Sequence, residues 1–247
     1  MLKNRVGETS KNKYGSIMKI TKYNNARDME VTFETGYVVK NVYYLSFKKG
    51  IVFDPLYKTN YNIGYFGIGK YTARDKAYNV WKDMFKRCYD KKYQANFNTY
   101  IGCSVCEEWF NYQVFAQWYE ENYYIVENQK MQIDKDVLIK GNKVYSPKTC
   151  VILPEEVNYI LLSRNKMRGT YPIGIYLHSD GDKYVAQSHD INKKMIYLGR
   201  YNTIKEAFQT YKEYKENVIK QVADKYYGII PEKAYKALYD YKVEITD

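Results

Sequence analysis

The sequence predicts an α+β protein made of small modules, and three observations support this fold class. Alternation of apolar and polar residues with a period of two, typical of strands, occurs near both ends of the chain. Apolar stripes at helical spacing occur between these segments and after the second of them. Positive charge is divided in the same way, with one basic excess in the N-terminal third and another after residue 160. We therefore expect three modules, covering residues 1–76, 77–162 and 163–247.

The N-terminal module is expected to be β-rich with a basic face. Strand-like alternation runs through residues 18–23 and 29–39, with turn-forming Asn and Gly residues between and after them, and a short apolar segment follows at 43–47. Residues 1–78 carry 14 Lys and Arg against 6 Asp and Glu. Nucleic acid is the polyanion that a cytosolic protein most often meets, so this excess favours phosphate binding over a merely solvated Lys-rich surface.

A Gly- and Tyr-rich stretch, residues 62–76, ends this module. Glycines let backbone N–H groups approach a phosphate closely, so the stretch could be a phosphate-contacting loop. The G-x-G-x-x-G fingerprint is absent, however, and this favours a plain linker between modules.

Two amphipathic helices are expected to open the central module. Residues 77–89 repeat apolar side chains at helical spacing, and residues 107–123 do the same around two tryptophans. A strand-like segment follows at 131–139, and after a turn a short apolar strand enters a helix near Pro154. Residues 79–160 carry 10 Lys and Arg against 11 Asp and Glu, so this module is close to neutral.

The central module contains six spaced motifs, which are WKDMFKRCY (81–89), VCEEW (105–109), IDKD (133–136), GN (141–142), YSPKTCVILP (145–154) and Asn158. Together they resemble the phage-encoded HNH (His-Me finger) proteins, over roughly residues 77–162. The resemblance implies a ββα finger in which a His at the end of the first strand activates water. It also implies that acidic or Asn side chains hold one divalent metal ion beside the scissile phosphate.

Lys135 stands where this resemblance places the catalytic His. A general base must accept a proton near neutral pH, and an ammonium group with a pKa near ~10 does not do so unless it is strongly desolvated. The neighbouring carboxylates of Asp134 and Asp136 favour the charged lysine further. We therefore expect a finger that is retained for DNA binding and has no nuclease activity. In the alternative, a nuclease, Mg²⁺ would be held by Asp134, Asp136, Asn142 and Asn158.

The four cysteines, Cys88, Cys103, Cys106 and Cys150, all fall inside the central module. Four thiolates could form a tetrahedral structural zinc site, and Cys103 and Cys106 have C-x-x-C spacing. The second pair lacks that spacing, and Cys88 lies on the apolar stripe of its helix, where a thiol behaves as a small buried hydrophobe. Both interpretations, zinc site and buried thiols, stay open at this point.

The C-terminal module is expected to be a three-stranded sheet packed on a helix. Alternating segments cover residues 173–178, 183–189 and 195–201, and the helix after them has an apolar inner side. That side carries Ala207, Phe208, Tyr211, Tyr214 and Val218. A further helix is expected to begin at Pro231 and to pack back on the module.

The motifs of this module are GIYL (174–177), DKYVAQ (182–187), KMIYLGRY (194–201) and TIKEAFQTY (203–211). They resemble the plant ethylene-response-factor (Apetala-type) DNA-binding domain, over about residues 173–215. The resemblance implies that the free sheet face enters a major groove, and it places DNA-contacting positions at Tyr176, Lys183, Tyr184, His189, Met195 and Tyr197. None of these residues is Arg, so the guanine contact made by a guanidinium group is missing and no sequence preference is predicted.

Basic residues near the sheet are expected to contact phosphates. They are Lys193, Lys194 and Arg200 in the sheet segment itself, and Arg164, Lys166 and Arg168 just before it. His178 and His189 are interpreted as sheet residues rather than a catalytic pair, because no Ser or Cys nucleophile with a supporting acid accompanies them.

These observations predict a phage or mobile-element protein that binds double-stranded DNA without cutting it. Two alternatives belong to other classes: an HNH-type nicking or homing endonuclease, and a regulatory or anti-defence protein that binds a nucleic acid or a nucleoprotein partner. No apolar run approaches the ~20 residues that span a bilayer, and the N-terminus lacks the apolar region of a signal peptide. We therefore expect no membrane partner and a cytoplasmic location, in the host cell if the protein is phage-encoded.

Overall fold

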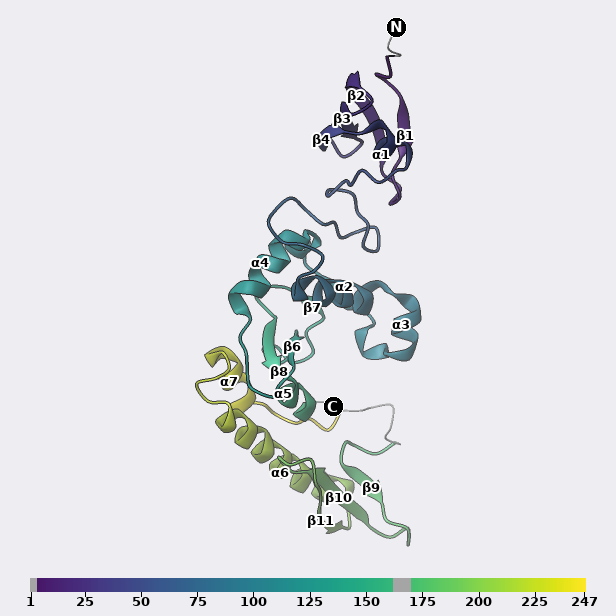
Figure 1. Ribbon diagram of the computed structural model, residues 1–247. Coiled ribbons are helices and arrows are strands. Elements are labelled where there is room, and N and C mark those ends of the chain that lie inside the picture. The colour runs from purple at the N-terminus through teal and green to yellow at the C-terminus, as the bar shows by residue number, and fades with distance from the viewer. Residues whose placement is uncertain (1–3, 162–169) are drawn as a thin grey trace. The chain divides into compact units, whose positions relative to one another are not determined.

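The computed structural model describes residues 4–161 and 170–247. Its helices and strands divide between two compact units (Figure 1). The first unit contains residues 1–121 and 143–146, and the second contains 122–142 and 147–247. The first holds a four-stranded antiparallel sheet, and the second holds a three-stranded antiparallel sheet with a helix packed on it. The prediction of an α+β protein is therefore confirmed.

The N-terminal sheet has the strand order β1-β2-β3-β4. Its strands are β1 (Thr9–Lys11), β2 (Ile17–Asn25), β3 (Asp28–Phe33) and β4 (Val38–Val42). The alternating residues Met18, Ile20, Met29, Val31 and Phe33 fill one face and form a core cluster. The segment expected at 29–39 is two strands, because Gly36 adopts a left-handed φ of 86° in the turn between them.

The apolar segment at 43–47 is helical rather than extended, and forms the short helix α1 (Tyr44–Lys48). Phe47 is the one residue of α1 that is buried, and it joins the core of the N-terminal sheet. The single helical turn of α1 places the Phe47 ring in the core. Packing of this ring, rather than the strand-like composition of the segment, therefore determines its structure.

The helices of the first unit are α2 (Lys76–Tyr89), α3 (Lys91–Asn96) and α4 (Tyr112–Asn122), with the 3-10 helices η1 (Asn98–Tyr100) and η2 (Glu107–Phe110) between them. Strands β5 (Ser104–Val105) and β7 (Val144–Tyr145) pair in parallel. Most of the apolar stripe of α2 is buried, whereas Val114 of the second predicted stripe is exposed. The indole Nε1 of Trp81 donates a hydrogen bond of 2.7 Å to the carbonyl oxygen of Trp109. This bond satisfies a polar group inside an aromatic core.

The stretch at 62–76 packs against α2 and α4. A Cβ atom at Gly64 would lie 2.8 Å from the ring of Trp81, and one at Gly67 would lie 1.9 Å from the Oδ1 atom of Asn111. The glycines are therefore required by close packing of the backbone on these helices. This explains the composition of the stretch without a phosphate.

The second unit begins with β6 (Met131–Asp134) and β8 (Val151–Pro154), which pair antiparallel, followed by α5 (Glu155–Ile160). The three-stranded sheet consists of β9 (Ile175–Leu177), β10 (Tyr184–His189) and β11 (Met195–Tyr201), in the order β11-β10-β9. Helix α6 (Ile204–Lys225) packs on it and contacts α7 (Glu232–Tyr239). Thr203 begins α6 with a reciprocal capping box to Glu206.

One hydrophobic core joins the two parts of the second unit. It contains Val151, Leu153 and Val157 from the β6–β8–α5 segment together with Val218 and Val222 from α6. The central module predicted at 77–162 is therefore divided: its first two helices and strands β5 and β7 belong to the first unit, and β6, β8 and α5 belong to the second.

None of the helices in the described residues is long and apolar enough to cross a membrane.

Candidate nucleic-acid interface

Strands β6 and β8 pair antiparallel, and helix α5 follows β8 directly, so these three elements form a ββα unit. Lys135 follows the last residue of β6, and only 6% of its surface is exposed. Its Nζ atom donates hydrogen bonds to Asp136 Oδ2 at 2.7 Å and to the carbonyl oxygen of Asn142 at 2.9 Å. The side-chain amide of Asn142 donates in return to the carbonyl oxygen of Lys135 at 2.6 Å. Lys135 and Asn142 thus hold the loop after β6 closed.

The strand expected at 131–139 ends at Asp134, because this side chain forms a turn. Asp134 Oδ1 accepts hydrogen bonds from the backbone N–H of Asp136 at 2.8 Å and of Val137 at 2.7 Å. Burial, together with the nearby charge of Asp136, raises the pKa of Asp134 to about 6. The two N–H donors and Lys135 oppose this rise, since they favour the carboxylate.

The four oxygen ligands expected of a nuclease are mostly engaged within this loop. Asp134 accepts from the turn, Asp136 accepts from Lys135, and Asn142 is bonded to Lys135. Asn158 differs, because its Nδ2 atom donates to Gln132 Oε1 at 3.1 Å while its buried Oδ1 atom has no hydrogen-bond partner among the described residues. Within 4–161 and 170–247, no three or more His, Cys, Asp and Glu side chains are grouped so that they could hold a metal ion.

None of the four cysteines forms a disulfide bond. Cys88, Cys103 and Cys106 belong to the first unit, and Cys150 belongs to the second. Cys88 is buried on the face of α2 that also carries Trp81 and Met84, as a small hydrophobe would be. Burial raises the pKa of the Cys106 thiol, which disfavours the thiolate that zinc would need.

The face of the β9–β10–β11 sheet that points away from α6 is called the outer sheet face. Val185 pairs with Tyr176 and Arg200, Gln187 pairs with Tyr197, and His189 pairs with Met195. Residues opposite each other in antiparallel strands share a face. The outer sheet face therefore carries Tyr176, Val185, Gln187, His189, Met195, Tyr197 and Arg200. Tyr197 is its most exposed aromatic residue, at 61%, and Val185 is fully buried in it.

Tyr184 does not lie on the outer sheet face, contrary to the prediction from the resemblance. It packs against the hydrophobic core of the second unit, and its ring meets that of Tyr171 with a centroid distance of 5.8 Å. A bulge lies between Ala186 and Gln187 and shifts the pairing of β10 with β11 by one residue. Gly199 pairs with the buried Ala186 on the helix side, so it does not share a face with Tyr197.

A charge cluster, not expected from sequence, lies at one end of this sheet. Arg200 donates to Asp180 Oδ2 and to His178 Nδ1, the latter at 2.8 Å, and His178 Nδ1 lies 2.6 Å from Asp180 Oδ1. The Arg200 hydrogen bond, with a smaller contribution from His178, lowers the pKa of Asp180 to about 2. Arg200, predicted as a phosphate contact, is therefore engaged by a carboxylate in the free protein.

The predicted lysines are more accessible. Lys183, Lys193 and Lys194 are exposed, and none of them forms an ion pair with a described residue. Lys193 lies over the ring of Tyr159, with its Nζ atom 4.8 Å from the ring centroid. Arg164, Lys166 and Arg168 lie outside the described residues.

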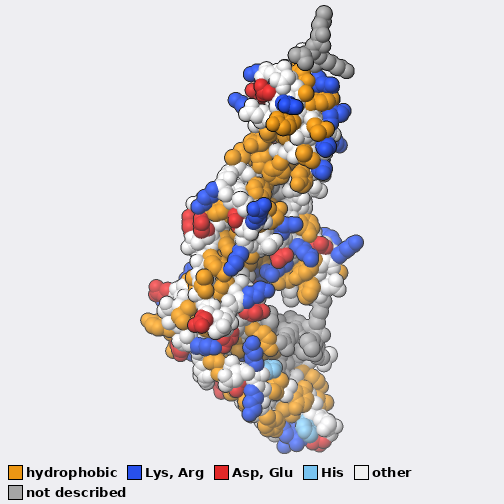
Figure 2. Space-filling model, in the orientation of Figure 1, with side chains coloured by type: hydrophobic (Ala, Val, Ile, Leu, Met, Phe, Trp, Pro, Cys, Tyr) orange, Lys and Arg blue, Asp and Glu red, His pale blue; other side chains and the backbone are white. Residues whose placement is uncertain are grey.

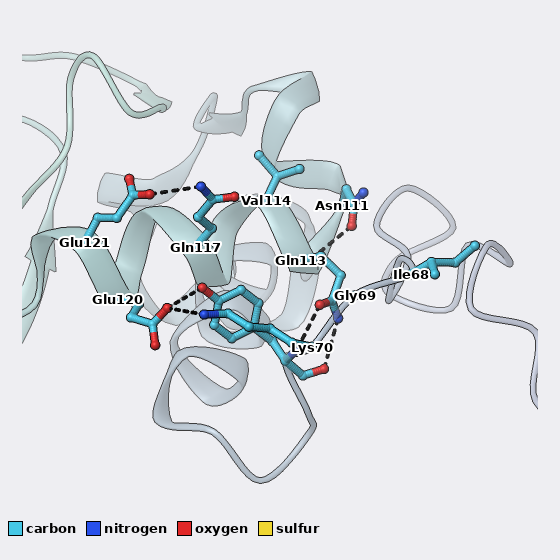
Figure 3. A pocket seen from close by; sticks show the side chains of 10 residues that line it. Ile68, Gly69, Lys70, Asn111, Gln113, Val114, Gln117, Glu120 and Glu121 are labelled. Carbon is cyan, nitrogen blue, oxygen red and sulfur yellow. Dashed lines mark hydrogen bonds and ion pairs between the residues drawn. The ribbon is translucent and has the colours of Figure 1, made fainter.

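A polar hollow of about 510 Å³ lies on α4 in the first unit (Figure 3). Gln113 accepts from the backbone N–H of Tyr71 at 2.9 Å and donates to its carbonyl oxygen at 3.0 Å, while Glu120 accepts from Lys70 at 2.9 Å. Glu121 also lines the hollow. Two carboxylates disfavour an anionic ligand in this hollow.

No family model, curated protein or solved structure matches this chain.

Proposed function

We propose that this protein binds double-stranded DNA through the outer sheet face and does not cut it. The observation that carries the proposal is the exposure of Tyr176, Met195 and Tyr197 on one sheet face. The lysines at its margins, Lys183 and Lys194, are exposed and outside the ion pairs of the described residues. A small sheet with an apolar, aromatic centre and cationic edges suits a nucleic-acid groove.

The chemistry of the outer sheet face favours shape and apolar contacts over guanine recognition. Its one guanidinium group, on Arg200, is paired with Asp180. Tyr197 and Met195 offer apolar contact of the kind that a thymine methyl group accepts, and Gln187 is an amide that can bond adenine. Lysines at the edges would contact phosphates, and these contacts make binding dependent on salt.

The absence of cleavage is inferred from the environment of Lys135. Its ammonium group donates to Asp136 and to the Asn142 carbonyl, whereas a general base needs a free lone pair. The ββα unit is then an architectural element that joins the core under the sheet. The phage or mobile-element origin inferred from the HNH resemblance belongs to the same proposal.

A nuclease is the second candidate, and one observation favours it. The buried Oδ1 atom of Asn158 has no partner among the described residues, and α5 is where the HNH resemblance places a metal ligand. A metal ion bound there would satisfy this oxygen.

A gel shift run beside a plasmid-nicking assay with Mg²⁺ or Mn²⁺ tests the proposal. We expect a shift without nicking, and a binding constant that falls steeply between ~50 and ~200 mM salt. Binding should weaken in Tyr197→Ala but not in Tyr227→Ala, a matched control because Tyr227 is 71% exposed and lies outside the sheet. Nicking that Asn158→Ala abolishes selects the nuclease. Absence of both shift and nicking overturns the proposal and points to the regulatory or anti-defence class, with a protein or nucleoprotein partner.

A further inference from the structure

We propose that the N-terminal four-stranded sheet is a second DNA-binding surface, which contacts the phosphate backbone without reading sequence. The inference rests on the proposed function for the nature of the ligand, duplex DNA. It concerns a different sheet, in the first unit, and different residues.

The surface is defined by the register of the sheet. Thr9 pairs with Lys19, Lys19 with Thr32, and Thr32 with Val38, so these residues form one row across all four strands. Their neighbours along the strands, Met18, Val31 and Phe33, are buried in the core of the sheet. The row therefore lies on the opposite face, which is called the N-terminal sheet face. It also carries Lys11, Ile17, Thr21, Glu30 and Lys40.

The lysines of this face are available to a ligand. Lys11, Lys19 and Lys40 are exposed, and no ion pair of the described residues includes any of them. The carboxylate of Glu30 lies 3.9 Å from Lys22, and Glu8, outside the face, is already paired with Arg5 and Lys48. Residues 4–50 carry 9 Lys and Arg against 4 Asp and Glu. Figure 2 shows several of these basic side chains on the N-terminal module, at the top of the view.

Three threonines of the face suit a phosphate backbone. Thr9, Thr21 and Thr32 are short hydroxyl side chains, and those of Thr21 and Thr32 lie 3.0 Å apart. Hydroxyl and ammonium groups are common phosphate contacts, and short side chains let a nucleic-acid strand approach the sheet closely. No Arg, Asn or Gln lies in the row from Thr9 to Val38, so the planar bidentate donors that read guanine or adenine are missing from it. The face therefore suits positioning rather than sequence recognition.

A second, weak DNA-binding surface on the same chain raises the overall affinity for DNA by increasing the effective concentration. Once one sheet has bound a duplex, the other is held near the same molecule and needs little further affinity to engage it. Three further phosphate contacts should steepen the dependence of log K on log salt by about 2.7, at about 0.9 for each contact.

The experiment uses the full chain and a triple variant, Lys11→Ala, Lys19→Ala and Lys40→Ala. The control is Lys82→Ala, Lys205→Ala and Lys233→Ala, which removes the same charge from exposed helix positions. We expect the first triple to weaken binding at 100 mM salt by at least about tenfold, equally on unrelated duplexes, and to reduce the salt slope by about 2 to 3. The corresponding triple variant with Arg at these three positions should bind duplex DNA as tightly as the wild type. All variants are first checked for an unchanged thermal transition.

Equal affinity and equal salt slope in the two triple variants overturn this inference. If Tyr197→Ala weakens binding while the N-terminal triple does not, the inference fails and the proposed function stands. If only the N-terminal triple weakens it, the proposed function fails and the N-terminal surface stands. Binding of the wild type to anionic lipid vesicles but not to duplex DNA overturns both.

Discussion

The Nζ atom of Lys135 lies 2.9 Å from the carbonyl oxygen of Asn142, and the side-chain amide of Asn142 lies 2.6 Å from the carbonyl oxygen of Lys135. The two residues are seven positions apart and are bonded in both directions across the loop that follows β6. In the HNH resemblance these positions belong to catalysis and metal binding. Here they form a closed structural contact, in which the amine is a donor.

Replacing Lys135 with Met should destabilise the protein without affecting DNA binding. The change removes two hydrogen bonds from a buried position and leaves the Asn142 carbonyl without this donor, while water hydrates the half-exposed Asp136 carboxylate, so the cost should be about 1 to 3 kcal/mol. Urea unfolding measures it, with Lys130→Met as the control at an exposed position. A cost no larger than that of the control would mean that the loop contact contributes nothing to stability.

Asp134 should make stability fall as pH rises. Its pKa is raised to about 6 in the folded protein, above the value of 3.8 for the free side chain, so the folded state binds more protons between these values. Asp134 therefore contributes a decrease in the free energy of unfolding on the order of 1 to 3 kcal/mol between about pH 4 and pH 6. Asp134→Asn keeps an oxygen for the turn and cannot ionise.

In this variant the decrease between pH 4 and pH 6 should disappear, and the protein should be more stable than the wild type at pH 7. Thermal unfolding followed across this pH range measures both effects. Asp182→Asn, at an exposed position, is the matched control. An Asp134→Asn curve parallel to that of the wild type would show that folding does not raise the pKa of this carboxyl group.

Local patterns were enough to predict most elements of the fold. The apolar stripe at 77–89 matches α2 to within one residue, and the alternation at 195–201 matches β11. The division into units was not predictable, because the core that contains Val151 and Leu153 together with residues of α6 joins segments far apart in the chain. The end of β6 was also missed, since an Asp within an alternating segment does not reveal that its side chain bonds to the backbone beyond it.

The candidate site was predicted only in part, because some of its features also depend on contacts between segments. Tyr197 is exposed as alternation requires, with its neighbour Leu198 packed on the core. In β10, however, Tyr184 and Val185 are both apolar in character, and only the pairing shows which one faces the helix. The bulge after Ala186 and the ion pair between Arg200 and Asp180 depend on neighbouring strands, so no pattern within one strand signals them.

Tyr197 and Tyr184 should respond differently to the same change. Tyr197→Ala should alter the relative affinity for different duplexes with little effect on stability, because the ring is exposed on the outer sheet face. Tyr184→Ala should lower the free energy of unfolding by about 2 kcal/mol, because the ring packs on the core. Lys183→Ala, at the sheet margin, should weaken binding to all duplexes alike.

Gel-shift competition over several duplexes, with thermal unfolding of each variant, separates these outcomes. If Tyr197→Ala unfolds the domain while Tyr184→Ala changes only the binding preference, the assignment of the two sheet faces is reversed.

Asp180→Asn should strengthen DNA binding. In the free protein the Arg200 guanidinium donates to the Asp180 carboxylate, and that carboxylate stays charged because its pKa is lowered to about 2. The change removes one negative charge beside the outer sheet face and releases a guanidinium group that can bond phosphate or guanine. We expect affinity at 100 mM salt to rise about threefold to tenfold, with a salt slope steeper by about 1 for one added phosphate contact.

The double variant Asp180→Asn with Arg200→Ala should lose the gain, because Asp180 acts through Arg200. Asp240→Asn removes the same charge from an exposed position after α7 and should leave affinity nearly unchanged. Unchanged or weaker binding in Asp180→Asn would show that the ion pair itself, rather than the released arginine, belongs to the DNA-binding surface.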